Sequence, residues 1–168
     1  MPVSDLSITE SKKLFDLNVW SYLAVTQAFL PLILKSRGII VNQTSISSAC
    51  TVPFHSPYGA SKAAIAAFSG SQRLELSPFG VRVIDLKTGA VHSNINDGPK
   101  PKLPKDSIYS VAREAVEKSM SLEEVVKTAM DREVWAKATV ADLLKKNPPP
   151  TIWRGTNAWL VWLSLIHI

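Results

Sequence analysis

The 168-residue sequence predicts an α/β fold that forms part of a doubly wound parallel sheet. Two short β-branched runs, "GIIVNQTS" (38–45) and "VRVIDLKTG" (81–89), are bounded by turn residues, as buried strands are. A long helical segment precedes each run, and helices that separate strands indicate a parallel sheet with helical crossovers. Hydrophobic residues make up 46% of the chain and charged residues 20%, which suits a globular domain with a sizeable core.

The first helix is expected to begin at Ser7, which forms a capping box with Glu10. The segment 12–36 that follows is apolar over much of its surface, so we expect a long and largely buried helix. Pro31 should kink this helix or mark a late break, and Gly38 is the stop signal after it.

The second helix is expected to have Ser56 as its N-cap and Pro57 as its first residue, and to run to about Leu76. After the second strand, residues 90–107 are rich in turn residues and are expected to form a loop. The remaining elements are expected in the order helix, helix, strand, over residues 107–120, 121–146 and 151–155.

The length of the chain corresponds to about one domain, and no internal repeat divides it. We expect a single partial domain over residues 1–168, with a catalytic core in 1–93, a substrate loop and helices in 94–150, and a last strand and apolar tail in 151–168. The tail "AWLVWLSLIHI" is apolar over 11 residues, too few to cross a bilayer, which takes about 20. It is a buried helix, an interfacial anchor that makes peripheral membrane contact, or the cut end of a longer segment.

The net charge of +5 includes three lysines in "PKPKLPK" (99–105), which form either a solvated loop or an attraction site for a phosphate, another anionic ligand or an anionic membrane surface. No basic stripe interleaved with aromatics and no zinc-finger spacing occurs, so we expect neither nucleic-acid binding nor a metal site. The lone Cys50 allows no internal disulfide, which suits a reducing compartment. The first residues do not resemble a secretory signal, so we expect a cytoplasmic protein.

Four polar residues stand at a spacing that indicates an active site. Tyr58 and Lys62 lie one helical turn apart, Ser45 comes 13 residues before Tyr58, and Asn18 comes 27 residues before Ser45. Ser47 and Ser48 compete with Ser45 for its role. The order and spacing resemble the short-chain dehydrogenase/reductase superfamily, whose catalytic tetrad is Asn, Ser, Tyr and Lys, so the resemblance implies a Rossmann-like fold and these four residues as catalytic.

The chemistry of these side chains fits the reduction of a ketone. A tyrosine hydroxyl can give a proton to the carbonyl oxygen, and a nearby lysine cation favours the phenolate that remains. A serine hydroxyl can hold the carbonyl and stabilise the charge that develops on it. The resemblance implies that Asn18 positions water behind Lys62, so that the proton of Tyr58 is replaced.

The stretch "LKTGAVHS" (86–93) resembles the loop of the superfamily that contacts the nicotinamide end of the cofactor. The resemblance implies that NADP(H) is bound by Gly89, Val91 and Ser93 together with Tyr58 and Lys62. Thr88 stands where the superfamily has proline, and it lacks the fixed φ of that residue.

A Gly-rich phosphate turn, G-x-x-x-G-x-G, occurs nowhere in the sequence. We therefore expect the C-terminal half of the fold, without the first strands and without a complete NADP(H) site. Two interpretations stay open at this point. The chain is a fragment of an NADPH-dependent oxidoreductase and is inactive alone, or it is a catalytically silent short product that interacts with full-length chains.

The stretches "LSITESKKLFDLNVWSYLAVTQAFLPLILKS" and "PPPTIWRGTNAWLVW" resemble fungal members close to the NADPH-dependent 1-acyldihydroxyacetone-phosphate reductases. This implies a lipid-like or polyketide-like ketone or alcohol substrate, and either a free cytoplasmic location or one at the surface of the endoplasmic reticulum or lipid droplets. The resemblance also implies a homo- or hetero-oligomer through helices 12–35 and 57–76. Apolar surface for the substrate is offered by Trp20, Val52, Phe54, Ile95 and Trp135.

Overall fold

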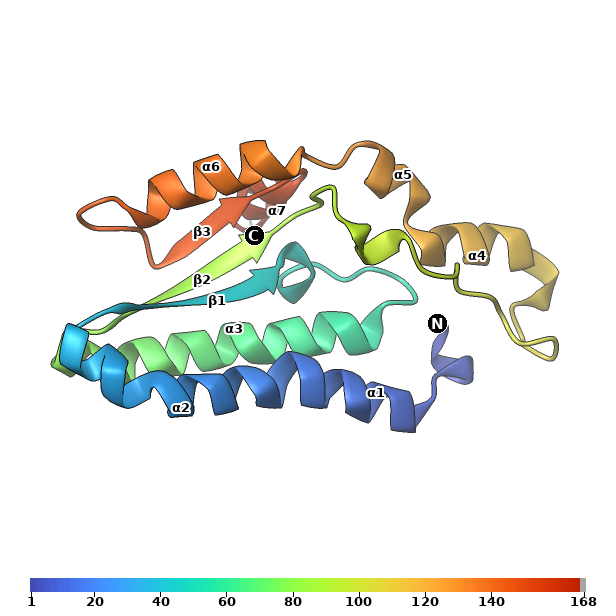
Figure 1. Ribbon diagram of the computed structural model, residues 1–168. Helices are drawn as coiled ribbons and strands as arrows, with labels where there is room; N and C mark the ends of the chain where they lie inside the picture. The colour runs from blue at the N-terminus through green and yellow to red at the C-terminus, as the bar shows by residue number, and fades with distance from the viewer. Residues whose placement is uncertain (167–168) are drawn as a thin grey trace.

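The computed structural model describes residues 1–166 and has the expected α/β architecture (Figure 1). Three strands, β1 (Ile39–Ser45), β2 (Arg82–Thr88) and β3 (Thr151–Arg154), pair in parallel in the order β1-β2-β3. The helices are α1 (Ile8–Phe15), α2 (Ser21–Ser36), α3 (Ser56–Leu76), α4 (Arg113–Ser121), α5 (Glu123–Lys127), α6 (Arg132–Leu143) and α7 (Ala158–Leu165).

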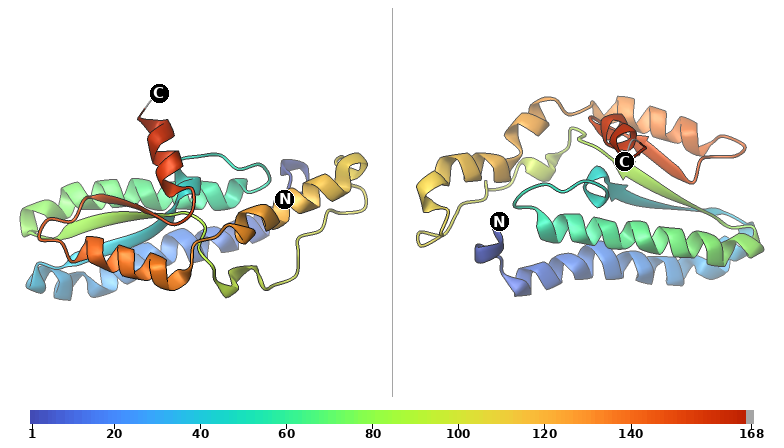
Figure 2. Two further views of the ribbon diagram at one scale, coloured as in Figure 1. Left: turned by 90° about the horizontal axis from the view of Figure 1, so that it is seen from above. Right: turned by 180° about the vertical axis from the view of Figure 1, so that it is seen from behind.

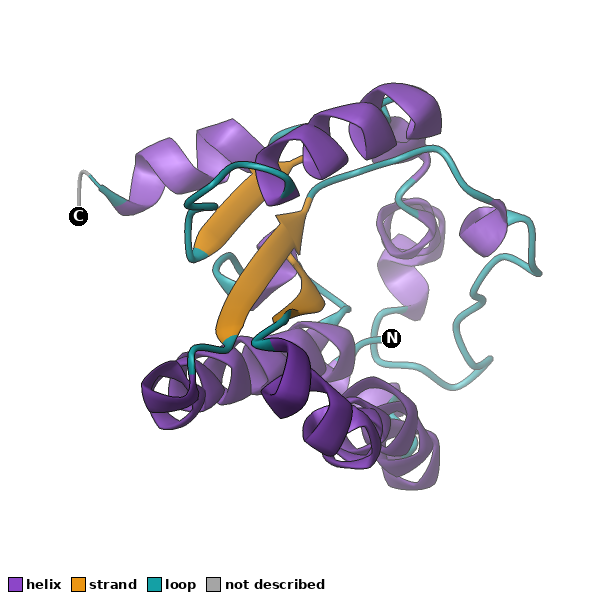
Figure 3. Ribbon diagram, turned by 60° about the vertical axis from the view of Figure 1, so that its left-hand side comes forward, coloured by secondary structure: helices purple, strands orange, loops and turns teal. Residues whose placement is uncertain are grey.

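The helices cover the sheet from both sides, as a doubly wound fold requires. Helix α3 connects β1 to β2 and lies with α2 on one face, whereas α6 lies on the other (Figures 1 and 3). On the α3 side, Ile40 and Val83 pack with residues of α2 and α3. On the α6 side, Ile84 and Ile152 pack against Trp135 and its neighbours. The alternation of side chains along the strands thus separates two apolar layers.

The first helical segment begins as expected but is not continuous. The Ser7 hydroxyl accepts a hydrogen bond from the amide of Glu10 at 3.2 Å, which confirms the N-cap. A π-helical turn at Asp16–Trp20 separates α1 from α2. Helix α2 then continues through Pro31 as far as Ser36, so the irregularity lies well before the proline.

The expectation that this segment is largely buried is wrong for the described residues. Val19 is buried, but the large side chains of Leu17, Trp20, Phe29 and Leu32 are each more than half exposed. By length and composition the run Ile8–Ser36 could cross a membrane, and only 6% of its most apolar window is buried. The segment carries apolar side chains on more of its surface than α3 and the sheet can cover. Within residues 1–166, one apolar face of this segment therefore stays exposed.

The region 121–146 forms two helices where one was expected. Helix α5 ends at Lys127, and α6 begins after Asp131, whose carboxylate accepts hydrogen bonds from the amides of Glu133 and Val134. The intervening Met130 pairs with the chain beyond β2, because its amide donates to Ala90 and its carbonyl accepts from His92. This long-range pairing, which local helix propensity does not reveal, breaks the helix.

The apolar tail forms helix α7, which projects from the body of the molecule (Figure 2, left). Ala158 is buried, but Trp159, Trp162 and Leu165 are each more than 40% exposed. The interpretation of the tail as a buried helix is therefore wrong for the described part of the chain. Residues 167 and 168 of the tail lie outside the described residues.

The segments that leave β2 and β3 touch backbone to backbone. The amide of Gly89 donates to the carbonyl of Arg154 at 2.7 Å, and Ala90 and Thr156 exchange hydrogen bonds. A Cβ at Gly89 would collide with the carbonyl oxygen of Thr156, and Gly155 has a φ of +96°. Only glycine allows this approach, which fixes the loop after β2 over the end of the sheet.

We predict that Gly89→Ala lowers the free energy of unfolding by about 3 kcal/mol, because the added methyl group meets backbone that cannot give way. Urea denaturation of the chain measures the effect. Gly70→Ala is the matched control: it lies inside α3, where an added methyl group would meet no neighbour within 4 Å, so the gain in helix propensity should stabilise the chain slightly. Equal midpoints for the two variants would contradict the role of Gly89.

Candidate active site

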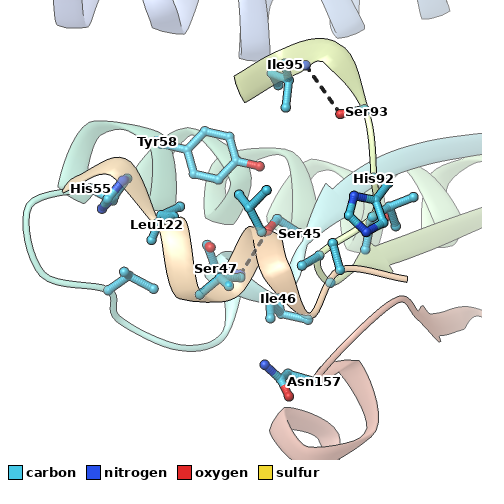
Figure 4. A pocket seen from close by; sticks show the side chains of 18 of the residues that line it. Ser45, Ile46, Ser47, His55, Tyr58, His92, Ser93, Ile95, Leu122 and Asn157 are labelled. Atoms are coloured by element: carbon cyan, nitrogen blue, oxygen red, sulfur yellow. Dashed lines mark hydrogen bonds between the residues drawn. The ribbon is translucent and has the colours of Figure 1, made fainter. Parts of the chain in front are cut away.

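A cavity of about 1550 Å³ opens at the carboxyl ends of β1 and β2. In doubly wound sheets this is the edge at which ligands bind. Its lining includes Ser45 and Tyr58, together with Gly89, Val91 and Ser93 of the loop after β2 (Figure 4). The structure therefore brings five of the predicted site residues to one cavity.

Ser45 is the last residue of β1, and the turn that follows fixes its orientation. Its hydroxyl oxygen accepts a hydrogen bond from the amide of Ser47 at 3.1 Å, which leaves the hydroxyl proton available to a ligand. Ser47 also lines the cavity and stays a competitor for the role of Ser45. The hydroxyl of Ser48 instead donates to the carbonyl of Ser45 at 2.6 Å and does not line the cavity.

Tyr58 lies in the first turn of α3, whose start differs slightly from the expectation. Ser56 is the first helical residue, and His55 occupies the N-cap position without a capping side chain, so Ser56 is not the cap and Pro57 takes the second helical position. The Tyr58 hydroxyl is directed toward the side of the cavity where Ser45 and His92 lie (Figure 4). A carbonyl oxygen placed between Tyr58 and Ser45 would face both hydroxyls.

Lys62 lies behind Tyr58, outside the cavity lining. Its ammonium group donates to the carbonyl of Gln43 at 3.2 Å and lies 5.8 Å from the ring centroid of Tyr58 and 5.6 Å from that of Tyr22. Burial lowers the pKa of Lys62 below its usual value. The cation is thus held close to Tyr58, as the i, i+4 spacing predicted.

Tyr22 is a neighbour of the site that the sequence reasoning missed. Its hydroxyl donates to the carbonyl of Gln43 at 3.0 Å, the same oxygen that holds Lys62. Burial, and to a lesser degree Tyr58, raises the pKa of Tyr22 above its ordinary value. The available signal was its position four residues after Asn18, on the same side of the helix.

Asn18 lies inside the π-helical turn and reaches α3 between Tyr58 and Lys62. Its side-chain amide donates to the hydroxyl of Ser61 at 3.0 Å, and that hydroxyl donates to the carbonyl of Tyr58 at 2.7 Å. Single π-turns often occur at functional sites. The structure thus shows a hydrogen-bond partner for the side-chain amide of Asn18. The positioning of water behind Lys62 stays a prediction.

The loop after β2 supplies the remaining predicted contacts. Val91 is paired with Met130, and the hydroxyl of Ser93 accepts from the amide of Ile95 at 3.5 Å. Beside them the buried hydroxyl of Thr88 has no hydrogen-bond partner among the described residues. The hydroxyls of Thr88 and Ser93 line the cavity, where they could meet the polar groups of the nicotinamide end of a dinucleotide. No group of three His, Cys, Asp or Glu side chains in residues 1–166 is arranged to hold a metal ion.

The apolar residues that were expected to serve a substrate separate into two groups. Val52, Ile95 and Trp135 line the cavity. Trp20 instead packs edge-on against Phe68, with centroids 6.3 Å apart, and Phe54 packs against Tyr109 at 5.8 Å. Further apolar lining comes from α4, α5 and the residue between them, inside the region 94–150 in which substrate helices were expected. These additional residues are Met120, Leu122, Val125 and Val126.

The family model for short chain dehydrogenases matches residues 1–103, and the chain belongs to this family. A short-chain dehydrogenase/reductase of Pestalotiopsis microspora is 51% identical over 164 residues, which are 95% of this chain and 56% of that protein. The NADPH-dependent 1-acyldihydroxyacetone phosphate reductase of Saccharomyces cerevisiae is 32% identical over 169 residues, 99% of this chain and 56% of that protein. The chain thus spans about half the length of these relatives.

The fold is also that of solved members of the family. A short-chain dehydrogenase from Streptomyces avermitilis superposes with a TM-score of 0.80 at 21% identity, over 99% of this chain and 60% of that chain. One from Burkholderia cenocepacia, solved in complex with NADP, gives a TM-score of 0.65 at 23% identity, over 99% and 59% of the two chains. The expectation of a partial Rossmann-like sheet is confirmed.

The environment of Lys62 predicts a pH-dependent difference in stability. A lysine whose pKa is lower in the folded than in the unfolded state opposes folding while it is charged, and this opposition fades as the pH rises toward the unfolded value of about 10.4. Lys62→Met removes the opposition. Its stability relative to the unmodified chain should therefore be highest at about pH 7 and should fall toward about pH 10.4.

Urea denaturation at a series of pH values measures this difference. Lys137→Met replaces an exposed lysine of α6 and is the control. A Lys62→Met profile parallel to that of the unmodified chain would show that burial does not disfavour the Lys62 cation.

Proposed function

We propose that this chain supplies the catalytic and substrate-binding part of an NADPH-dependent oxidoreductase that interconverts a ketone and a secondary alcohol. One observation carries the proposal: Ser45 and Tyr58 open on a single cavity, with the Lys62 ammonium close behind the Tyr58 ring. Membership of the short chain dehydrogenase family supports it. The choice of NADPH draws on relatives whose names state it, in Saccharomyces cerevisiae and Schizosaccharomyces pombe.

In this mechanism the chemistry that bound NADPH would supply is a hydride for the carbonyl carbon. Tyr58 donates a proton to the carbonyl oxygen, while the hydroxyl of Ser45 donates a hydrogen bond to that oxygen and stabilises its developing charge. Lys62 stabilises the phenolate that Tyr58 becomes until a proton from solvent restores it. The nicotinamide end would be held by Tyr58 and Lys62 and by the loop residues Gly89, Val91 and Ser93.

The proposed substrate is a lipid-like or polyketide-like ketone or alcohol. Helices α4, α5 and α6 contribute apolar side chains to the cavity lining, among charged ones such as Glu123 and Arg132, and these apolar side chains can bury an aliphatic or polyketide chain. At the rim, Lys100 of the basic cluster forms an ion pair with Glu123 at 2.5 Å. This pair supports the interpretation of "PKPKLPK" as a solvated loop that borders the pocket.

We predict that the 168-residue chain alone neither binds NADPH tightly nor turns over substrate. The pyrophosphate of a dinucleotide binds at a Gly-rich turn before a helix, and the sequence contains no such turn. Titration of the purified chain with NADPH, followed by cofactor fluorescence, tests this. Saturable binding in the micromolar range would contradict the prediction.

The catalytic assignment is tested in a completed chimera, in which this chain replaces the matched region of the Pestalotiopsis microspora relative. Tyr58→Phe should lower kcat by about 10²–10⁴-fold with little change in NADPH affinity, because it removes the proton donor while Lys62 and the loop after β2 still hold the nicotinamide end. Lys62→Ala should lower both. Stopped-flow NADPH oxidation and fluorescence titration measure the two effects, and near-normal turnover by Tyr58→Phe would refute the assignment.

The second candidate function is a catalytically silent partner of full-length chains. The exposed apolar residues of α2 favour it, as does the edge of β1 away from β2, which pairs with no strand among residues 1–166. Oligomer formation through the long helices follows from the same surface. Co-expression with a tagged full-length relative discriminates the two functions, since a silent partner would co-purify at fixed stoichiometry.

Membrane contact through α7 and a location at the endoplasmic reticulum or lipid droplets stay predictions.

A further inference from the structure

A buried ion pair lies on the face of the sheet opposite to the cavity wall formed by α6. Val83, Asp85 and Lys87 stand two residues apart along β2, so their side chains point to the same face of the sheet. This is the face that α3 covers. The Lys87 ammonium lies 2.9 Å from an Asp85 carboxylate oxygen, and the side chains are 12% and 6% exposed. The hydroxyl of Thr44 donates to the other oxygen of Asp85.

The pair is connected to the candidate catalytic serine through one side chain. The Lys87 ammonium donates to the hydroxyl of Ser48 at 2.8 Å, and that hydroxyl donates to the carbonyl of Ser45 at 2.6 Å. The ring centroid of Trp153 on β3 lies 5.5 Å from the ammonium and confines it further. The contacts thus run from β2 to the turn at Ile46–Ser48, whose backbone orients the Ser45 hydroxyl.

A contribution to the stability of the fold does not by itself explain this ion pair. Desolvation of two charges offsets most or all of their attraction, and apolar residues of similar volume often serve a core equally well. A buried pair instead fixes geometry, because each charge requires its partners at a set distance. Here the ion pair fixes the position of the turn behind Ser45, which strand pairing alone does not hold.

We propose that Lys87, held by Asp85, is a positioning residue that acts through Ser48 to hold the Ser45 hydroxyl in the geometry needed to bind a substrate carbonyl. The proposal rests on the proposed function for its catalytic part. Its structural part, the bracing of the turn at Ile46–Ser48, is independent of any activity. The two parts are therefore tested separately.

The structural test uses Cys50, the single cysteine of the chain, as a reporter. Its thiol contacts the carbonyl of Ile46 at 3.2 Å, and burial raises its pKa, so a loosened turn should expose it and speed its reaction. In the 168-residue chain, Ser48→Ala removes the link and leaves the ion pair intact. We expect its reaction with a maleimide at pH 7.5 to be about five-fold faster or more.

Two further variants complete this test. The pair Asp85→Asn with Lys87→Met removes both charges together, so that neither is left buried and unpaired, and it should speed labelling to a similar degree. Lys137→Met, on the exposed side of α6, should react like the unmodified chain. Unchanged labelling of both the Ser48→Ala and the double variant would overturn the bracing of the turn.

The catalytic test uses the completed chimera and a double-mutant cycle. Ser48→Ala should lower kcat about ten-fold with the KM for NADPH unchanged, because the Ser45 hydroxyl is displaced from the developing charge. In a Ser45→Ala background the same change should have no further effect. An equal loss of kcat in both backgrounds would overturn the proposal that Ser48 acts through Ser45. Failure of the proposed function would show differently, as normal turnover by the Tyr58→Phe variant.

Discussion

The parallel pairing of β1 with β2 is the constraint on which the site depends. A parallel pair needs a crossover, and α3 provides it by returning the chain from the carboxyl end of β1 to the start of β2. The first turn of α3 therefore begins beside the residue that ends β1. Ser45 and Tyr58 meet at one cavity for this reason, and Lys62 follows one turn behind.

Polar groups reinforce this arrangement on the buried side of the strands. Asn42 of β1 donates to Ser69 and Gln72 of α3, and Asn18 reaches the same helix through Ser61. Buried donors and acceptors are costly unless they are matched, so each pair fixes how the elements lie against one another. The Asp85–Lys87 pair extends the same principle to the turn behind Ser45.

The described residues leave two surfaces open, the edge of β1 away from β2 and the apolar residues of α2. A doubly wound fold places further strands beside an edge such as that of β1, and the exposed apolar residues of α2 offer a second surface for packing. The relatives are longer, since this chain covers 56% of each, and they have room for such elements. The proposed association with other chains follows from these surfaces, whereas the proposed inactivity of the chain alone follows from the lack of a Gly-rich turn in its sequence.

The sequence by itself determined the fold class and the parallel strands, because strand patterns are local. It also predicted the group Asn18, Ser45, Tyr58 and Lys62, from the i, i+4 spacing of the last two and from the resemblance to the short-chain dehydrogenases. Only the tertiary structure decided the break at Met130, since pairing with Ala90 outweighs helix propensity there. It also decided the low burial of 12–36 and the position of Tyr22 beside Lys62. Burial and long-range hydrogen bonds depend on which segments meet, and local sequence does not encode this.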